Sequence, residues 1–261
     1  MSSGSSARIH EPAEQGANAA WVATGPSSGK FRKRDAAWYL AAYLYGSFPF
    51  VHLLARQRGV DLRRTGSGAV GGSNLWAATG TMRGIAGWLA DASKGVVPVV
   101  LGRRLGYSES VSQYSALFGL AGQCWPVTLG FNGGRGISTF LGAMLEIDRV
   151  TWRRTLVPLI GGSLWRVARL LILGGLAGSQ LRTSRSKSVP LGSFIGVVAA
   201  PVLYMARFWP ARTPSYAPWL LSGCVLVRRL TARQLDDVSR DLGNRPAILL
   251  YRLLYDRNTP C

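Results

Sequence analysis

Two glycine-rich polar stretches carry the residues of this chain best suited to binding a phosphate. The first, residues 65–74, reads TGSGAVGGSN, and the second, residues 131–139, reads FNGGRGIST. Glycine allows backbone conformations with φ > 0 and has no Cβ to block a ligand. Successive backbone N–H groups in such turns can converge on one anion, with Ser, Asn or Arg side chains completing the site. The two stretches therefore predict two anion-binding loops.

Asp91 and Lys94 lie between these stretches, three residues apart and so on one face of a helix. Lys94 falls inside an apolar segment, where a cation is costly unless it meets an anion or water. Asp91 could hold Lys94 or orient a substrate hydroxyl. A plain helix ion pair is the alternative for these two residues. For the glycine stretches, the alternative is turns between spans, or small residues that let membrane helices pack closely.

The segments that must position these residues are apolar. Seven of them are candidate membrane spans, several marginal: 36–55, 84–101, 112–131, 137–147, 156–181, 190–208 and 216–227. The first is uncharged and about long enough to cross a bilayer. Arg166 and Arg169 share one face of the fifth, which should look into protein, water or headgroups. The sequence predicts an all-α membrane protein, a polytopic bundle of about seven transmembrane helices.

The composition supports a membrane protein with polar tails. Charged residues make up 16% of the chain and apolar residues 48%, with 31 Lys and Arg against 12 Asp and Glu, a net charge of +19. The arginines flank apolar segments, as they do in loops that face anionic lipid, and no nucleic-acid-binding motif accompanies them. We therefore expect three regions: a disordered basic tail over 1–35, a membrane domain over 36–230, and an amphipathic basic tail over 231–261.

Other motifs are weaker. The run from Gly66 to Gly71 matches the dinucleotide pattern G-x-G-x-x-G, but no apolar strand precedes it. His10 and His52 are the two histidines, and neither has Asp five residues later. This argues against the glycerolipid acyltransferases that use H-x-x-x-x-D as a general-base pair. Basic residues at both ends of the first span leave its orientation open.

The order of the motifs resembles that of the bacterial integral-membrane acyl-phosphate:glycerol-3-phosphate acyltransferases. That family has G-S-I-P, G-S-G-N-x-G-x-T-N, D-x-x-K-G and G-H-x-F-P…F-K-G-G-K-G-x-A-T. This chain has, in the same order, GSFP at 46–49, GSGAVGGSN at 66–74, DASKG at 91–95, GQCWP at 122–126 and GFNGGRGIST at 130–139. The resemblance covers roughly residues 40 to 230.

The resemblance implies transfer of an acyl group from acyl phosphate to the 1-hydroxyl of glycerol 3-phosphate, which gives lysophosphatidic acid for phospholipid synthesis. It implies no cofactor, no metal and no covalent acyl-enzyme. The expected partners are the two substrates and the lipid bilayer, not nucleic acid, and nothing is implied about the oligomeric state. The expected location is the bacterial plasma membrane, with the glycine loops and the active site facing the cytoplasm.

Site residues follow by position in the family motifs. Ser67, Asn74, Asp91 and Lys94 would be catalytic. The residues expected to bind substrate or phosphate are Gly66, Gly68, Gly71, Ser73, Gly133, Gly134, Arg135, Gly136 and Ser138. Both substrates carry a phosphate, which suits two loops, and an activated anhydride lets positioning and charge stabilisation supply much of the catalysis.

The chain departs from the family pattern at four polar positions. Ala69, Ala77, Gln123 and Asn132 stand where the family has Asn, Arg, His and Lys. The closing family motif, a His followed by Asn-Ile-x-Arg, has no clean match near Arg228 and Arg229. Loss of a side chain that touches phosphate costs a few kcal/mol of transition-state binding. A second hypothesis is therefore a catalytically silent paralogue that binds phospholipid or supports a partner in the membrane.

Overall fold

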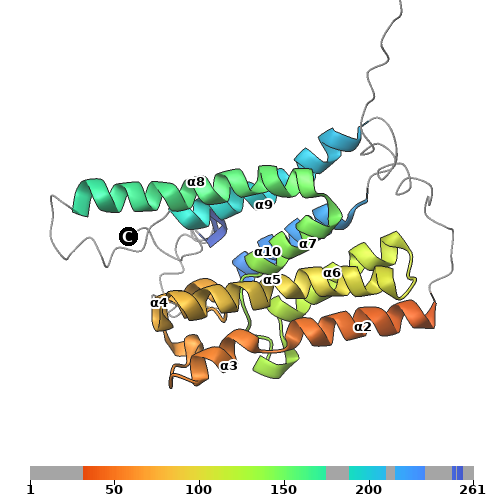
Figure 1. Cartoon of the computed structure of the whole chain (residues 1–261), viewed down its shortest axis with the longest axis horizontal. Helices are drawn as coiled ribbons and strands as arrows, with labels where there is room; N and C mark the ends of the chain where they lie inside the picture. The colour runs from red at the N-terminus through yellow and green to blue at the C-terminus, as the bar shows by residue number, and fades with distance from the viewer. Residues whose placement is uncertain (1–31, 175–187, 210–214, 233–248, 251, 255–261) are drawn as a thin grey trace, which may run out of the picture. The chain divides into compact units, whose positions relative to one another are not determined.

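The structure is a computed structural model that describes residues 32–174, 188–209, 215–232, 249–250 and 252–254. Regular structure in these ranges is helical throughout (Figure 1). The helices are α2 (Lys33–Ser47), α3 (Phe50–Arg56), α4 (Gly72–Thr79), α5 (Thr81–Arg104), α6 (Glu109–Cys124), α7 (Ile137–Ile147), α8 (Arg149–Gly174), α9 (Ser188–Phe208) and α10 (Ala217–Thr231). Two short 3-10 helices join them, η1 (Leu62–Arg64) and η2 (Val127–Leu129).

The first predicted span is broken, which corrects the expectation of one helix over 36–55. Helix α2 ends at Ser47, and α3 begins at Phe50, directly after Pro49. Proline disfavours the helical conformation in the residue before it and supplies no backbone donor. The apolar composition runs unbroken across this point and so conceals the break.

Two further boundaries beside the site differ from the expectation. The first glycine stretch is a loop only as far as Gly71, because α4 begins at Gly72 and includes Ser73 and Asn74 in its first turn. The third predicted span, 112–131, ends as a helix at Cys124, after which the chain turns through Pro126 and η2. In both places the turn brings polar backbone to the end of a helix.

Helix α5 lies at the centre of the arrangement and packs against α2, α3, α4, α6 and α7. Helix α6 also packs on α2, and α10 packs on α6, α7 and α9, while α8 runs along α9 (Figure 1). Gly95 allows the tight contact between α5 and α7, since a Cβ there would lie 2.1 Å from the backbone oxygen of Thr139. Small residues at such crossings let membrane helices approach closely.

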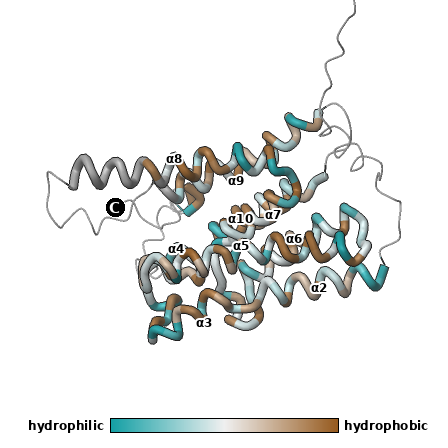
Figure 2. Tube along the Cα trace, viewed as in Figure 1, coloured by the Kyte–Doolittle hydropathy of each residue, from teal (hydrophilic) through white to brown (hydrophobic). Residues whose placement is uncertain are grey.

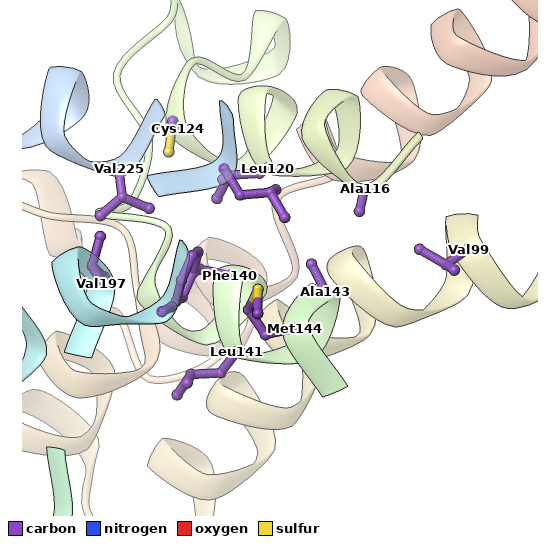
Figure 3. Close-up of a cluster of buried hydrophobic side chains, with 12 residues drawn as sticks. Val99, Ala116, Leu120, Cys124, Phe140, Leu141, Ala143, Met144, Val197 and Val225 are labelled. Atoms are coloured by element: carbon purple, nitrogen blue, oxygen red, sulfur yellow. The ribbon is translucent and has the colours of Figure 1, made fainter. Parts of the chain in front are cut away.

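The main cluster of buried apolar side chains joins five of these helices (Figure 3). Its residues are Val99, Ala116, Leu120, Cys124, Phe140, Leu141, Ala143, Met144, Val197, Ala200, Leu221 and Val225. Lipid is as apolar as this cluster, so in a membrane close packing rather than exclusion of water holds it together. The cluster includes residues near the end of α6 and the start of α7, and the second glycine loop connects these two helices.

Two helices in the described ranges are long and apolar enough to cross a membrane, Thr81–Arg104 and Pro190–Phe208. Apolar residues lie along the helices, and hydrophilic residues gather at the outer ends of α2 and α6 (Figure 2). Some predictions fall outside the described residues. They concern the side chains of Arg166 and Arg169, residues 175–181 of the fifth predicted span, and most of the predicted N-terminal and C-terminal tails.

Candidate active site

A pocket opens where the end of α2, the middle of α5, the end of α6 and the two glycine loops meet. It measures about 210 Å³, including the part that opens to solvent. The residues that line it are Ser47, Phe48, Pro49, Val51, Val70, Asp91, Lys94, Gln123, Pro126, Leu129, Gly133 and Gly134. One wall is apolar, and the polar groups converge from three helices and the second loop.

Lys94 is the cation of this pocket and is only 2% exposed. Its Nζ donates a hydrogen bond to Oε1 of Gln123. It also lies 3.7 Å from Oδ1 of Asp91 and 5.8 Å from the ring centroid of Phe50. A buried ammonium group needs such partners because its desolvation is costly. The ammonium group is therefore fixed at the pocket wall, where it can meet an anionic substrate.

Asp91 lies between the first loop and Lys94. A Cβ on Gly71 would lie 3.8 Å from its Oδ2, and its Oδ1 lies 3.7 Å from Nζ of Lys94. Its backbone oxygen accepts from Oγ1 of Thr139 at 2.7 Å, which ties α5 to α7. The predicted pair is thus a helix ion pair that also lines the pocket, and the two interpretations of it are compatible.

Asn74 shapes the first glycine loop. Its buried Nδ2 donates to the backbone oxygens of Leu62, Thr65 and Ala69 at 3.1, 2.9 and 3.0 Å. Its Oδ1 accepts from the backbone N–H of Ser67 at 3.4 Å. One side chain thus gathers the carbonyl groups along the whole loop, which is what a loop without regular structure requires.

Four backbone N–H groups of this loop have acceptors inside the protein. The donors are Ser67, Gly68, Ala69 and Gly71, and their acceptors are Asn74 Oδ1, Thr65 O, Ser67 Oγ and Ala69 O, at 3.4, 3.1, 3.4 and 3.2 Å. We expected such groups to converge on an anion. These four N–H groups have acceptors within the turn itself, because buried N–H groups take the nearest acceptor.

The second glycine loop is held by Arg228 of α10. The guanidinium group donates to the backbone oxygens of Gly134 and Gly133 at 3.0 and 2.9 Å, and to Oδ1 of Asn132 at 3.3 Å. The N–H of Gly134 donates to the backbone oxygen of Gln123 at 3.0 Å. Arg228 is 3% exposed, so the loop is fixed from the protein interior.

The two glycine loops lie side by side, as predicted. The Nε2 of Gln123 donates to the backbone oxygen of Val70 at 3.4 Å. A Cβ on Gly134 would lie 2.7 Å from that oxygen and 2.6 Å from Nε2 of Gln123. Only glycine allows this approach, so Gly134 is where the loops touch.

The predicted site residues divide into two groups. Asp91, Lys94, Gly133 and Gly134 line the pocket. Outside its wall, within the described part of the chain, lie Gly66, Ser67, Gly68, Gly71, Ser73, Asn74, Arg135, Gly136 and Ser138. Ser73 is exposed, Arg135 is half-buried, and Gly136 and Ser138 are buried at the start of α7.

Three polar residues at or beside the pocket were not among the predicted site residues: Ser47, Gln123 and Arg228. Ser47 belongs to the GSFP motif and Gln123 to the GQCWP motif, so both lay within segments that the family motifs had marked. Arg228 lies in a helix that no motif matched cleanly. Its place directly after the apolar segment 216–227 is a signal in the sequence that could have found it.

At the entry to the first loop, Asp61 caps η1. Its carboxylate accepts from the backbone N–H, Nε and Nη2 of Arg63 at 3.0, 3.1 and 3.0 Å. These charge-assisted hydrogen bonds lower the pKa of Asp61 from 3.8 to about 2. The same contact raises the pKa of Arg63. The ion pair therefore persists at all physiological pH values.

Comparison with known proteins gives a consistent result. Residues 36–236 match the family model described as glycerol-3-phosphate acyltransferase. Glycerol-3-phosphate acyltransferase 5 of Dehalococcoides mccartyi is 34% identical over 225 residues, which cover 84% of this chain and 87% of that protein. The glycerol-3-phosphate acyltransferase of Geobacter sulfurreducens is 35% identical over 165 residues, 63% of this chain and 75% of the relative.

A solved structure has the same fold. It is the glycerol 3-phosphate form of PlsY (YgiH), described as an integral membrane glycerol 3-phosphate acyltransferase. The match has a TM-score of 0.63 at 23% identity and covers 87% of this chain and 96% of that one. The fold is therefore that of an integral membrane protein. By its family model and its relatives, the chain belongs to the glycerol-3-phosphate acyltransferase family.

Proposed function

We propose that this protein transfers an acyl group from acyl phosphate to the 1-hydroxyl of glycerol 3-phosphate, producing lysophosphatidic acid and inorganic phosphate. We place it in the bacterial plasma membrane as a multi-pass protein of about seven spans, with the pocket facing the cytoplasm. Family membership supports the reaction. The proposal for the donor rests on the motif pattern of the sequence.

The observation that carries the proposal is the position of Lys94. A buried ammonium group, held by Gln123 and Asp91, lines a pocket between two glycine loops. Both proposed substrates are phosphate anions. A fixed cation in a site of low dielectric constant binds such a group more strongly than a cation in water does.

The proposed reaction needs few groups from the protein. The oxygen of the glycerol hydroxyl attacks the acyl carbonyl carbon, the bond from that carbon to the phosphate oxygen breaks, and the leaving phosphate takes the hydroxyl proton. Lys94 neutralises the charge that gathers on the departing phosphate. The main contribution of the site is then to hold both substrates in register.

The loops have supporting roles in this proposal. Gly133 and Gly134 form the wall against which one phosphate lies, and Asn74 and Arg228 hold the two loops at the correct separation. Ser67, Ser73, Arg135 and Ser138 lie in or directly after the same loops but outside the pocket wall, and we propose that they contact the parts of the substrates that extend beyond it. We propose the same for the backbone of Gly66, Gly68, Gly71 and Gly136.

The test is an assay of the purified protein in lipid, supplied with acyl phosphate and glycerol 3-phosphate. We expect release of phosphate and formation of lysophosphatidic acid in equal amounts. Lys94→Met should lower kcat/KM by about 10²- to 10³-fold, as loss of one fixed charge-stabilising group does. Lys33→Met is the matched control, because Lys33 is exposed at the other end of α2, and it should retain full activity.

Two results would contradict the proposal. Release of phosphate by wild-type protein no faster than by Lys94→Met would favour a silent paralogue. Release of phosphate without lysophosphatidic acid would mean that the protein hydrolyses acyl phosphate and does not transfer the acyl group. Replacing acyl phosphate with an acyl thioester identifies the donor directly.

A further inference from the structure

The pocket contains a buried hydroxyl group without a partner. Ser47 ends α2 and is 1% exposed, and its Oγ has no hydrogen-bond partner in the described part of the chain. Such groups are rare in native proteins, because leaving one unsatisfied has an energetic cost. Each therefore calls for an explanation.

Three other serines in these helices satisfy their hydroxyls locally, whereas Ser112, which does not line the pocket, also has a buried hydroxyl without a partner in the described part of the chain. Those of Ser93, Ser115 and Ser193 donate to the backbone oxygen three residues earlier at 2.8, 2.6 and 2.8 Å. This is the usual solution for serine in a helix. The hydroxyl of Ser47 does not make that bond, and Ser47 lines the pocket together with Lys94, Asp91 and Gln123.

The backbone around Ser47 is firmly fixed. A Cβ on Gly46 would lie 2.1 Å from the backbone oxygen of Gly119, so α2 touches α6 backbone to backbone directly before Ser47. The backbone oxygen of Ser47 accepts a hydrogen bond from Oγ1 of Thr128 at 2.5 Å. The following residues, Phe48 and Phe50, have ring centroids 4.5 Å apart. The position of the hydroxyl is thus preorganised, as a binding group requires.

We infer that Ser47 is a substrate-binding residue, whose hydroxyl donates a hydrogen bond to a phosphate oxygen of the substrate that Lys94 neutralises. The inference rests on the proposed function and adds a second side chain to the phosphate site. Lys94 supplies charge from α5, and Ser47 supplies a directed donor from α2. Together they place the phosphate at the break between α2 and α3, beside the glycine loops.

The experiment compares Ser47→Ala with Ser115→Ala. Ser115 is also fully buried, but its hydroxyl bonds within α6 and does not line the pocket. For Ser47→Ala we expect the KM for one substrate to rise about tenfold to hundredfold, as for a lost hydrogen bond to a charged group. Separate titrations show whether that substrate is glycerol 3-phosphate or acyl phosphate. Both KM values of Ser115→Ala should stay near those of the wild type.

Thermal unfolding without substrate separates binding from structure. Ser47→Ala removes no hydrogen bond from the free protein, so its Tm should equal or exceed that of the wild type. Ser115→Ala should have a lower Tm. A fall in the Tm of Ser47→Ala, or unchanged KM values for both substrates, would overturn the inference.

A binding measurement keeps this test independent of turnover. We expect glycerol 3-phosphate or inorganic phosphate to raise the Tm of the wild type and to raise that of Ser47→Ala much less. If the wild type releases no phosphate in the assay, the proposed function fails, and this Tm shift still tests Ser47 as a phosphate ligand. Equal shifts in both proteins would overturn the inference by themselves.

Discussion

The amide group of Asn74 holds three backbone carbonyl oxygens of the first loop at once, those of Leu62, Thr65 and Ala69. We expect Asn74→Asp to lower the stability of the protein by about 1–3 kcal/mol, because it removes the donor and turns an acceptor toward those oxygens. Thermal unfolding in detergent measures this. Asn132→Ala is the control and should cost less, since the substitution removes the side-chain acceptor of one hydrogen bond of 3.3 Å from Arg228. Unchanged stability of Asn74→Asp with loss of activity would instead make Asn74 a substrate ligand.

The Asp61–Arg63 pair gives a prediction on pH. The pKa of Asp61 is lowered to about 2 in the folded protein, below its ordinary 3.8. Its stabilising effect is therefore present above pH 3.8 and is lost as the pH falls toward 2. Both side chains are partly exposed, so the effect is below about 1 kcal/mol. Asp61→Asn should have a slightly lower Tm than the wild type at neutral pH, and the difference should vanish on acidification. A difference that grew in acid would contradict this assignment.

Among single residues, the sequence predicted best where a charge conflicted with its surroundings. Lys94 and Asp91 interrupt an apolar helix, and that conflict, together with the D-x-x-K-G motif, identified them as candidates for the pocket that they line. Ser47 and Gln123 create no such conflict, because serine and glutamine are tolerated in many buried positions. These two residues matter because they line the pocket, and helix packing decides which residues line it.

At the scale of helices and loops, the sequence located the apolar segments but not all of their ends. The segments 137–147 and 190–208 match α7 and the main part of α9. The break at Pro49 and the early end of α6 were missed because both lie within apolar runs. Those two missed turns form the apolar wall of the pocket through Phe48, Pro49 and Pro126.

Gly134 tests how closely the two loops must approach. Gly134→Ala puts a methyl group 2.7 Å from the oxygen of Val70 and 2.6 Å from Nε2 of Gln123, so the loops must separate. We expect a loss of about 1–3 kcal/mol of stability from this overpacking, together with a higher KM for phosphate substrates. Gly161→Ala, where nothing lies within 4 Å in a helix, should be neutral or slightly stabilising. Normal activity in Gly134→Ala would show that contact between the loops is not needed.

For the whole molecule, the central feature is that polar groups from distant parts of the chain meet where α2 and α6 end beside the middle of α5. Ser47, Lys94, Gln123 and Gly134 come from four segments and line one pocket. The opposite end of α5 and α6 carries its own ion pairs, from Arg103 to Glu109 at 2.7 Å and to Glu146 at 2.9 Å. The order of the motifs in the sequence indicated that the two glycine loops belong to one site. No motif indicated that Arg103, Glu109 and Glu146 form ion pairs, which only the structure shows.

This arrangement predicts which residues share a side of the membrane. Ser73 follows the first loop, Val127 precedes the second, and Ser110 lies near the other end of α6, all three exposed. Helix α6 has 16 residues, a length of about 24 Å, so its ends lie near opposite surfaces of the hydrocarbon layer. In a background with Cys124, Cys224 and Cys261 changed to serine, we expect Ser73→Cys and Val127→Cys to react with an impermeant maleimide from the same side of sealed vesicles. Ser110→Cys should react only from the other side. Labelling of Ser73→Cys and Val127→Cys from opposite sides would separate the two loops and remove the basis for a shared phosphate site.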